Sequence, residues 1–248
     1  MNKKTIQSVF LGMVLLLMYL PILILAVYSF MDSAIIGKSG SFTVKNYVYL
    51  FHSEDLRSMI FGTLILAVVV AVISTILGTL GAIGAFYSSM KFKRPIHLMN
   101  QIPVVNADVV TGFSICVLLI VFFKMDKASY VPLVIGLVSL CSPFVYLSVI
   151  PRLKQMDPQL YEAALDLGCS PFGALRKVVL PQLTSGIVSG FMMSITLTLD
   201  DYFITTYTKP SMFDTISTYV VNATKGAQTD VKTALWALST IIFLIVIF

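Results

Sequence analysis

Six apolar stretches, each close to the length of a membrane-spanning helix, constrain this chain more than any other feature of its sequence. They cover residues 9–30, 60–87, 102–123, 131–150, 183–207 and 233–248. A helix needs about 20 apolar residues to cross the hydrocarbon core of a bilayer. Only 12% of the 248 residues are charged, against roughly a quarter in soluble proteins. We therefore expect an all-α, polytopic membrane protein with six transmembrane helices, folded as a single domain over residues 1–248.

Both ends of the chain leave an alternative open. Lys3 and Lys4 precede the first apolar stretch, as basic residues precede the apolar core of a secretory signal peptide. Because the stretch is longer than such a core and no A-x-A pattern follows it, we expect a retained first helix. The stretch 233–248 is too short for a hydrocarbon core of about 30 Å at about 1.5 Å per residue, as in a chain that is cut short at this end.

The basic residues indicate which loops face the cytoplasm. With six helices both ends lie on the same side of the membrane, and Lys3 and Lys4 favour the cytoplasmic side. The loops 88–98 and 151–181 then share that side. Together with the N-terminus they hold nine of the 17 basic residues, and the longer outside loops balance the other eight with acids. The charge pattern thus predicts a cytoplasmic N-terminus.

The longer of these two loops carries two successive sets of helix signals. Asp157-Pro158 is a typical N-cap followed by proline at the first helical position, and Gly168 suits the left-handed residue that ends a helix. Ser170-Pro171 repeats the start signal. We expect a short helix, a sharp turn and a second helix that returns to the membrane.

The first of these two short helices has a surface suited to a partner. Ala163 and Ala164 are small enough to let another protein approach closely, and Glu162 and Asp166 lie four residues apart on one face. From the residues alone, a well-capped connection without a partner is an equally good interpretation.

A resemblance favours the partner. The EAA loop of permeases from ATP-binding-cassette (ABC) importers has the pattern E-A-A, three residues, G, nine residues, I, one residue, L-P. This sequence resembles it, with Val178 in place of the isoleucine. The resemblance implies the type I ABC importer permease fold and a coupling loop at 151–181 that binds a separate, cytoplasmic ATPase subunit. It assigns that coupling to Glu162, Ala163, Ala164, Asp166, Gly168, Leu180 and Pro181.

No pattern for catalysis or metal binding is present. Gly37-Lys38-Ser39 resembles the end of a P-loop, but Asp32 stands where the first glycine is needed. The two histidines are isolated and the three cysteines do not form a cluster. We expect no catalytic residues, no metal site and no cofactor on this chain; the resemblance implies that ATP and Mg²⁺ bind to the ATPase partner.

Three aspartates fall within the predicted spans and are candidates for binding a cargo. An aspartate at a helix centre costs roughly 2.5–3.5 kcal/mol, which makes Asp108, Asp200 and Asp201 functional candidates. A cation on a translocation path would bind such carboxylates, and the rings of Tyr202 and Tyr207 offer faces for an ammonium group. The alternative is that the adjacent pair of aspartates only caps a helix end at the membrane interface.

The segment around the aspartate pair also carries a resemblance. LTLDDYFITTYT is similar to the S-L-D-D-F-V-I-S segment of spermidine and putrescine permeases, and Asp108 within IPVVNADVVTG matches less well because Ala107 replaces a proline. The short, Lys-rich N-terminus resembles the C-type subunit of that family. The resemblance implies a bacterial plasma-membrane protein in contact with lipid. It also implies a second permease subunit, an ATPase dimer and an extracytoplasmic substrate-binding protein as partners, without nucleic acid.

Other functions remain as alternatives. The same kind of importer can carry another cargo. A secondary transporter would use the membrane aspartates with an ion gradient, but the coupling loop argues against it. A membrane enzyme is disfavoured because no nucleophile and base are paired. The second apolar stretch adds the small-residue pairs Gly78/Ala82 and Gly81/Ala85, which allow close helix packing within this chain or with the partner permease.

Overall fold

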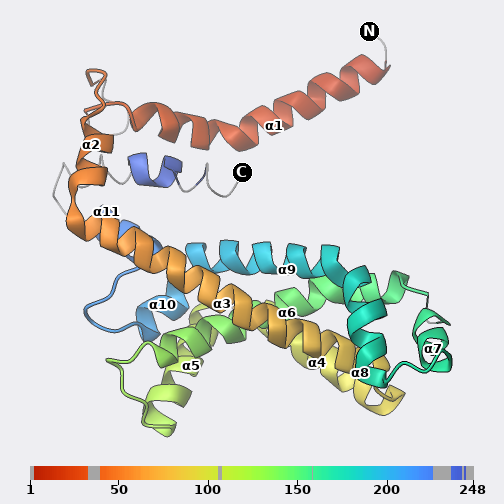
Figure 1. Ribbon diagram of the computed structural model, residues 1–248. Helices are drawn as coiled ribbons and strands as arrows, with labels where there is room; N and C mark the ends of the chain where they lie inside the picture. Colours follow the sequence, from red (N-terminus) through yellow and green to blue (C-terminus); the bar gives the residue numbers. More distant parts are fainter. Residues whose placement is uncertain are drawn as a thin grey trace. The chain divides into compact units, whose positions relative to one another are not determined.

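The computed structural model of the chain describes residues 3–32, 40–105, 108–157, 159–225, 236–241 and 243, and most of these residues are helical (Figure 1). Within those ranges the β-structure is an isolated bridge between Met31 and Phe42. The chain divides into two compact units, residues 1–58 with 219–248, and residues 59–218.

The first unit contains the long helix α1 (Lys3–Tyr28) and the short helix α2 (Lys45–His52). Asn46 is buried and its side-chain amide donates hydrogen bonds to the backbone oxygens of Ser29 (2.9 Å) and Met31 (3.0 Å). These bonds fix the start of α2 against the end of α1. The apolar side chains of α1 itself are exposed, as in a helix whose surroundings are lipid or other chains.

The second unit is built around α6 (Val131–Gln155), the most buried of the long helices. The other elements that enter it are α3 (Glu54–Tyr87), α4 (Met90–Val105), α5 (Asp108–Cys116), the π-helix Val117–Phe122, α7 (Gln159–Asp166), α8 (Pro171–Ala174), the π-helix Leu175–Val179, α9 (Leu180–Asp200), α10 (Phe203–Thr208) and α11 (Ile216–Lys225). Proline occupies a first-turn position in α6, α8 and α9, where its missing N–H costs no hydrogen bond within the helix.

Helices α6 and α9 pack along most of their length in opposite directions. A Cβ atom at Gly190 would lie 3.0 Å from the Val145 side chain, and one at Gly186 would lie 3.0 Å from the Ser148 backbone oxygen. Glycine is therefore needed at both positions of this interface. The two helices approach each other as closely as small residues allow in membrane proteins.

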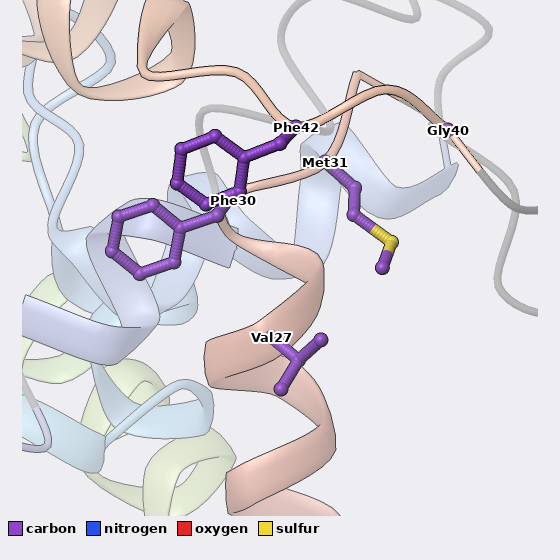
Figure 2. Close-up of a pocket in the computed structure, with 5 residues that line it drawn as sticks. All are labelled: Val27, Phe30, Met31, Gly40 and Phe42. Atoms are coloured by element: carbon purple, nitrogen blue, oxygen red, sulfur yellow. The ribbon is translucent and has the colours of Figure 1, made fainter.

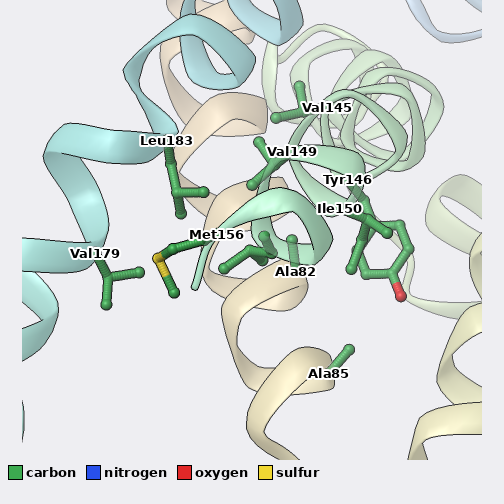
Figure 3. Close-up of a cluster of buried hydrophobic side chains, with 10 residues drawn as sticks. Ala82, Ala85, Val145, Tyr146, Val149, Ile150, Met156, Val179 and Leu183 are labelled. Atoms are coloured by element: carbon green, nitrogen blue, oxygen red, sulfur yellow. The ribbon is translucent and has the colours of Figure 1, made fainter. Parts of the chain in front are cut away.

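Two clusters of buried apolar side chains lie at different places along α6, one towards its C-terminal end and one towards its N-terminal end. The first joins α3, α6 and the start of α9 (Figure 3), and its buried members are Ala82, Ala85, Val145, Tyr146, Val149, Ile150, Leu153, Met156, Val179 and Leu183. The second joins α3, α6 and α10, and its buried members are Leu66, Val70, Leu133, Leu137, Val138, Leu140, Cys141 and Ile204. Together the clusters hold the second unit around α6.

Four helical segments are long and apolar enough to cross a membrane, at residues 7–28, 54–87, 131–155 and 171–200. They confirm the predicted first, second and fourth helices and most of the fifth. The predicted third span is divided between the end of α4 and the shorter apolar helix 109–122, with residues 106 and 107 outside the described part. The predicted sixth span lies mostly outside the described residues, although 236–241 are helical.

The predicted fifth span, residues 183–207, was wrong at its C-terminal end. Helix α9 stops at Asp200 because Asp201 adopts an extended backbone (φ −65°, ψ 121°), and a new helix begins at Phe203. The hydropathy of the segment continues across this break, so the apolar pattern alone does not reveal it.

The structure also shows what the small residues of α3 contact. A Cβ atom at Gly78 would lie 2.6 Å from Val145 Cβ and 2.8 Å from the Ser142 backbone oxygen in α6 of the same chain. Ala82 is buried in the first apolar cluster beside it. At Gly84, by contrast, a Cβ atom would meet no other heavy atom within 4 Å.

These two glycines give a matched test of the packing. We expect Gly78→Ala to destabilise the protein by about 1–3 kcal/mol, because the added methyl group overfills the contact between α3 and α6. Gly84→Ala should not destabilise it, because the added methyl group meets no other heavy atom within 4 Å and alanine favours a helix more than glycine does. The difference in stability between the two variants is measured by heating each in detergent and determining the fraction of protein that remains monodisperse. Equal stability of the two variants would contradict the packing described here.

Candidate coupling loop and substrate path

The predicted start of the first loop helix is present. The Asp157 carboxylate accepts a hydrogen bond from the backbone N–H of Gln159 at 2.9 Å, and the Asp157 backbone oxygen accepts one from Leu160. Asp157 thus satisfies N–H groups that the first turn of α7 leaves free. Pro158, the predicted first helical residue, lies outside the described residues.

The predicted sharp turn at Gly168 is also present. Gly168 has φ +84°, in the left-handed region that favours glycine. Its N–H donates to the Leu165 oxygen at 2.9 Å, and the N–H of Cys169 donates to the Ala164 oxygen at 3.0 Å. This pair of bonds is the Schellman motif, which ends a helix by satisfying its last free carbonyl groups.

The second start signal forms a helix immediately after the turn. Ser170 is the N-cap of α8, and its hydroxyl oxygen accepts from the N–H of Gly173 at 3.1 Å. Helix α8 continues through the π-helix into α9, where Leu180 and Pro181 form the first turn. Figure 1 shows α7 and α8 as two short segments joined by a tight connection. We refer to residues 157–181 as the elbow.

The exposed face of the elbow differs in part from the prediction. Glu162, Ala163 and Asp166 are exposed, as a docking face requires. The expectation for Ala164 was wrong, because it is only 7% exposed and α7 packs there against the π-helix and α8 of the same chain. Its small size serves packing within the chain.

Sequence reasoning missed two large apolar residues on the elbow. Leu167 is 86% exposed and Phe172 is 75% exposed, one on each side of Gly168. Both side chains lie on the part of the elbow that also exposes Glu162, Ala163 and Asp166. Their position in a polar loop outside the predicted spans was the signal that would have found them.

The aspartate pair lies where α9 ends, and the two carboxylates differ in their surroundings. Asp201 is 9% exposed, and its carboxylate accepts hydrogen bonds from both the N–H and the hydroxyl of Thr205, each at 2.8 Å. It therefore holds the first turn of α10. Asp200 has an exposed side chain, and its backbone oxygen accepts a hydrogen bond from the Ser217 hydroxyl at 3.1 Å.

Helix α10 is seated between α5 and α6 by two glycines. A Cβ atom at Gly112 of α5 would lie 3.1 Å from the Ile204 backbone, and one at Gly136 of α6 would lie 2.8 Å from the Ile204 side chain. Ile204 is fully buried there. The break after Asp200 thus turns the chain into a short helix with a fixed position.

The other predicted path residues lie around this short helix. Tyr207 is half-buried, with its ring 5.9 Å from that of Phe113 in α5. Tyr202 is half-buried and its ring lies 5.3 Å from that of Phe203. Asp108 is the first residue of α5, the helix that packs against α10, but its side chain lies outside the described part. The backbone therefore brings all five predicted path residues to one end of the second unit.

The loop after α10 contains an ion pair that sequence reasoning did not find. The Lys209 ammonium group lies 2.9 Å from an Asp214 carboxylate oxygen and donates to the Phe213 backbone oxygen at 2.7 Å. Thr218 also donates to Asp214, at 3.2 Å. These bonds order the loop that carries Ser217 to Asp200. The five-residue spacing within a loop gives no periodic signal from which the pair can be read.

A pocket in the first unit is lined by Val27, Phe30, Met31, Gly40 and Phe42 (Figure 2). The rings of Phe30 and Phe42 are stacked with centroids 5.6 Å apart. The lining is apolar and includes none of the predicted site residues, so the pocket offers no charge for a cationic cargo. Within the described ranges, no three His, Cys, Asp or Glu side chains are grouped to hold a metal ion.

Comparison with known proteins supports the resemblance inferred from the elbow. Residues 78–248 match the family described as binding-protein-dependent transport system inner membrane component. The spermidine/putrescine transport system permease protein PotC of Escherichia coli K12 is 29% identical over 230 residues, which cover 92% of this chain and 84% of PotC. The putrescine transport system permease protein PotI of the same organism is 30% identical over 202 residues, covering 77% of this chain and 69% of PotI.

Solved structures confirm the fold. A bacterial ABC transporter involved in the import of the acidic polysaccharide alginate contains a chain with a TM-score of 0.72 at 16% identity, covering 98% of this chain and 91% of that one. The same kind of transporter, in complex with an alginate pentasaccharide-bound periplasmic protein, gives a TM-score of 0.73. The predicted all-α, multi-pass permease fold is therefore confirmed, and the chain belongs to the family of inner-membrane components of binding-protein-dependent transport systems.

Proposed function

We propose that this chain is the C-type permease subunit of an ATP-driven importer that carries polyamines such as spermidine and putrescine. The observation that carries the proposal is the elbow, which has the helix caps and the exposed face that an ATPase contact requires. The polyamine cargo rests on the similarity to PotC and PotI, whose names give spermidine and putrescine as their substrates. Transport would proceed by alternating access to a path between this chain and a second permease subunit.

The aspartate pair supports the cationic cargo. Polyamines carry several ammonium groups, and a carboxylate that is free to receive them attracts each one by its charge. Asp200, whose side chain is exposed, is the residue that we assign to the cargo. Asp201 is already engaged by Thr205 and holds α10 in place. Tyr202, Tyr207 and Asp108 remain candidates for further contacts.

The partners follow from the parts that this chain presents. The exposed elbow fits a dimer of ATPase subunits, which would bind ATP and Mg²⁺ and carry out the hydrolysis. The exposed apolar surface of α1 and the outward faces of α3 fit lipid and a second permease subunit. An extracytoplasmic substrate-binding protein would deliver the cargo, as the periplasmic protein is bound to the alginate transporter.

Purification of the assembled transporter tests this function. The chain is co-expressed with the ATPase, second permease and binding protein from its own genome, and a tag on this chain is used for purification. We expect the ATPase to co-elute and proteoliposomes to accumulate labelled spermidine only with ATP. Uptake that continues without ATP but collapses with an ionophore would instead establish a secondary transporter.

The orientation in the membrane is a separate prediction. We expect the N-terminus to be retained and cytoplasmic, because Lys3 and Lys4 favour that side. A cysteine added before Lys3 should resist impermeant thiol reagents in intact cells and react after permeabilisation. Cys169, which is half-buried in the elbow, is predicted to lie on the same side and should likewise react only after permeabilisation. Labelling of the added cysteine in intact cells, or loss of Lys3 and Lys4 from the intact mass, would refute the prediction.

A further inference from the structure

Helix α3 is not joined to the elbow by a chain connection, and the contacts described between them are side-chain contacts. The elbow continues from α6 at its start and into α9 at its end, so both of those helices are joined to it by the chain itself. Helix α3 ends at Tyr87 and leads into α4 instead. Movement of the elbow therefore reaches α3 through packing contacts, either by way of α6 or directly from the elbow.

Such a contact exists at the end of α3. The ring of Tyr161 in α7 lies 4.9 Å, centroid to centroid, from the ring of Tyr87, with the two planes tilted by 43°. The Tyr87 ring also meets Phe86 edge-on at 5.2 Å. Tyr161 and Phe86 both pack against the first apolar cluster, which includes Ala82 and Ala85 of α3. Tyr87 itself is 42% exposed and reaches the core that joins α3 to α6 and α9 through its contacts with Tyr161 and Phe86.

Helix α7 has one face that packs against the rest of the second unit and another face that is exposed. Tyr161, Ala164 and Leu165 are spaced three and four residues apart, which places them on one face, and all three are buried or half-buried. Glu162, Ala163 and Asp166 are exposed. One short, well-capped helix therefore contacts α3 with one side and leaves the other free for a partner.

We propose that the contact between Tyr87 and Tyr161 is a second mechanical link, which passes movement of α7 to α3. The inference rests on the proposed function, because it assumes that an ATPase moves the elbow. The two tyrosines are positioning residues that contact neither the cargo nor ATP. We assign the link to the contact between the two tilted rings and not to the hydroxyl groups.

Substitutions of the two tyrosines in the full transporter test the link. We expect Tyr161→Ala and Tyr87→Ala to assemble with the ATPase and hydrolyse ATP, while the spermidine imported per ATP falls by about fivefold or more. Tyr161→Phe and Tyr87→Phe should keep the wild-type ratio because the ring remains. The double alanine variant should be no worse than either single variant. Tyr49→Ala, at an exposed position in α2, is the matched control.

A tether gives an independent measurement. With the native cysteines replaced, Tyr87→Cys and Tyr161→Cys are joined by a short bifunctional thiol reagent in the assembled transporter. If α7 and α3 move together, the tethered protein should import more spermidine per ATP than the untethered double variant. Loss of the remaining uptake on tethering would overturn the link, since the contact would then have to open during transport.

The outcomes separate this inference from the proposed function. Alanine variants with the wild-type import ratio, or phenylalanine variants as damaged as alanine ones, would overturn the link while the wild-type protein still imports. If spermidine uptake falls only in proportion to the amount of assembled transporter, the tyrosines contribute to packing and do not pass movement from α7 to α3. That result would also overturn the proposed link. If the wild-type chain neither binds an ATPase nor imports with ATP, the proposed function itself fails.

Discussion

Replacing Gly168 with proline should reduce uptake by roughly a hundredfold without preventing insertion in the membrane. Gly168 has φ +84°, whereas proline fixes φ near −65° and lacks the N–H that donates to Leu165. A proline in an incompatible backbone costs about 3 kcal/mol. Each 1.4 kcal/mol is a factor of ten in an equilibrium, so the correctly folded elbow becomes rare. No membrane-spanning helix is altered, so the protein should still reach the membrane.

Gly168→Asn is the matched control, because asparagine tolerates the left-handed region better than other side chains do. A Cβ atom at Gly168 would also meet no other heavy atom within 4 Å. The asparagine variant should therefore retain most of the uptake. ATPase co-elution and spermidine uptake are measured for both variants at equal amounts in the membrane. Normal uptake by Gly168→Pro would refute the assignment of the elbow to coupling.

Glu162→Lys changes the exposed face of the elbow and leaves its turn intact. The Glu162 side chain is exposed on α7, so reversing its charge should weaken ATPase association. Because Glu162 lies in the first turn of α7, a lysine there also costs the helix about 0.3–1 kcal/mol, which is too little to unfold the protein. Together with Gly168→Pro, Glu162→Lys separates the docking surface from the fold of the elbow. Unchanged association would exclude Glu162 from the contact.

The second large effect concerns the aspartate pair. We expect Asp200→Asn to reduce spermidine uptake by about tenfold, equivalent to ~1.4 kcal/mol, because it removes the exposed carboxylate assigned to the cargo. Asp201→Ala should also reduce uptake, but for another reason. It leaves the N–H and hydroxyl of Thr205 without their acceptor, and loss of a helix cap costs about 1 kcal/mol.

Asp201→Asn distinguishes charge from structure at the second position. The asparagine side-chain oxygen can still accept from Thr205, so this variant should be more stable in detergent than Asp201→Ala and should transport better than Asp200→Asn. Uptake is normalised to assembled transporter, and ATPase association should be intact in all three variants. If Asp200→Asn, Asp201→Asn and the double variant all import normally, the pair only caps helix ends and the polyamine cargo loses its physical support.

The elbow was predictable from the sequence because its signals are local. Asp157 and Ser170 accept hydrogen bonds from backbone N–H groups two and three residues further along the chain, and Gly168 has the predicted left-handed backbone. The apolar stretches were also sufficient to find four of the membrane helices. Hydropathy and caps depend on neighbouring residues alone.

The remaining features depend on contacts between distant parts of the chain. The break after Asp200 follows from the seating of Ile204 against Gly112 and Gly136, which hydropathy does not register. Burial of Ala164 depends on how α7 folds back on the segments that follow it. Nothing in a single sequence specifies such pairings, so the separate roles of the two aspartates became visible only in the structure.

The close glycine contacts between α6 and α9 have a consequence for the energetics of transport. At Gly186 and Gly190 the backbones of α6 and α9 are in close contact, which leaves little room for one helix to shift along the other. We therefore expect α6 and α9 to move together as a rigid pair. Helix α9, at about 1.5 Å per residue, extends from the elbow to Asp200. Under the proposed function, an ATPase that acts on the elbow is then coupled thermodynamically to the end of α9 at Asp200. This coupling is reciprocal. If binding of the ATPase to the elbow changes the affinity for the cargo by some factor, binding of the cargo must change the affinity of the elbow for the ATPase by the same factor.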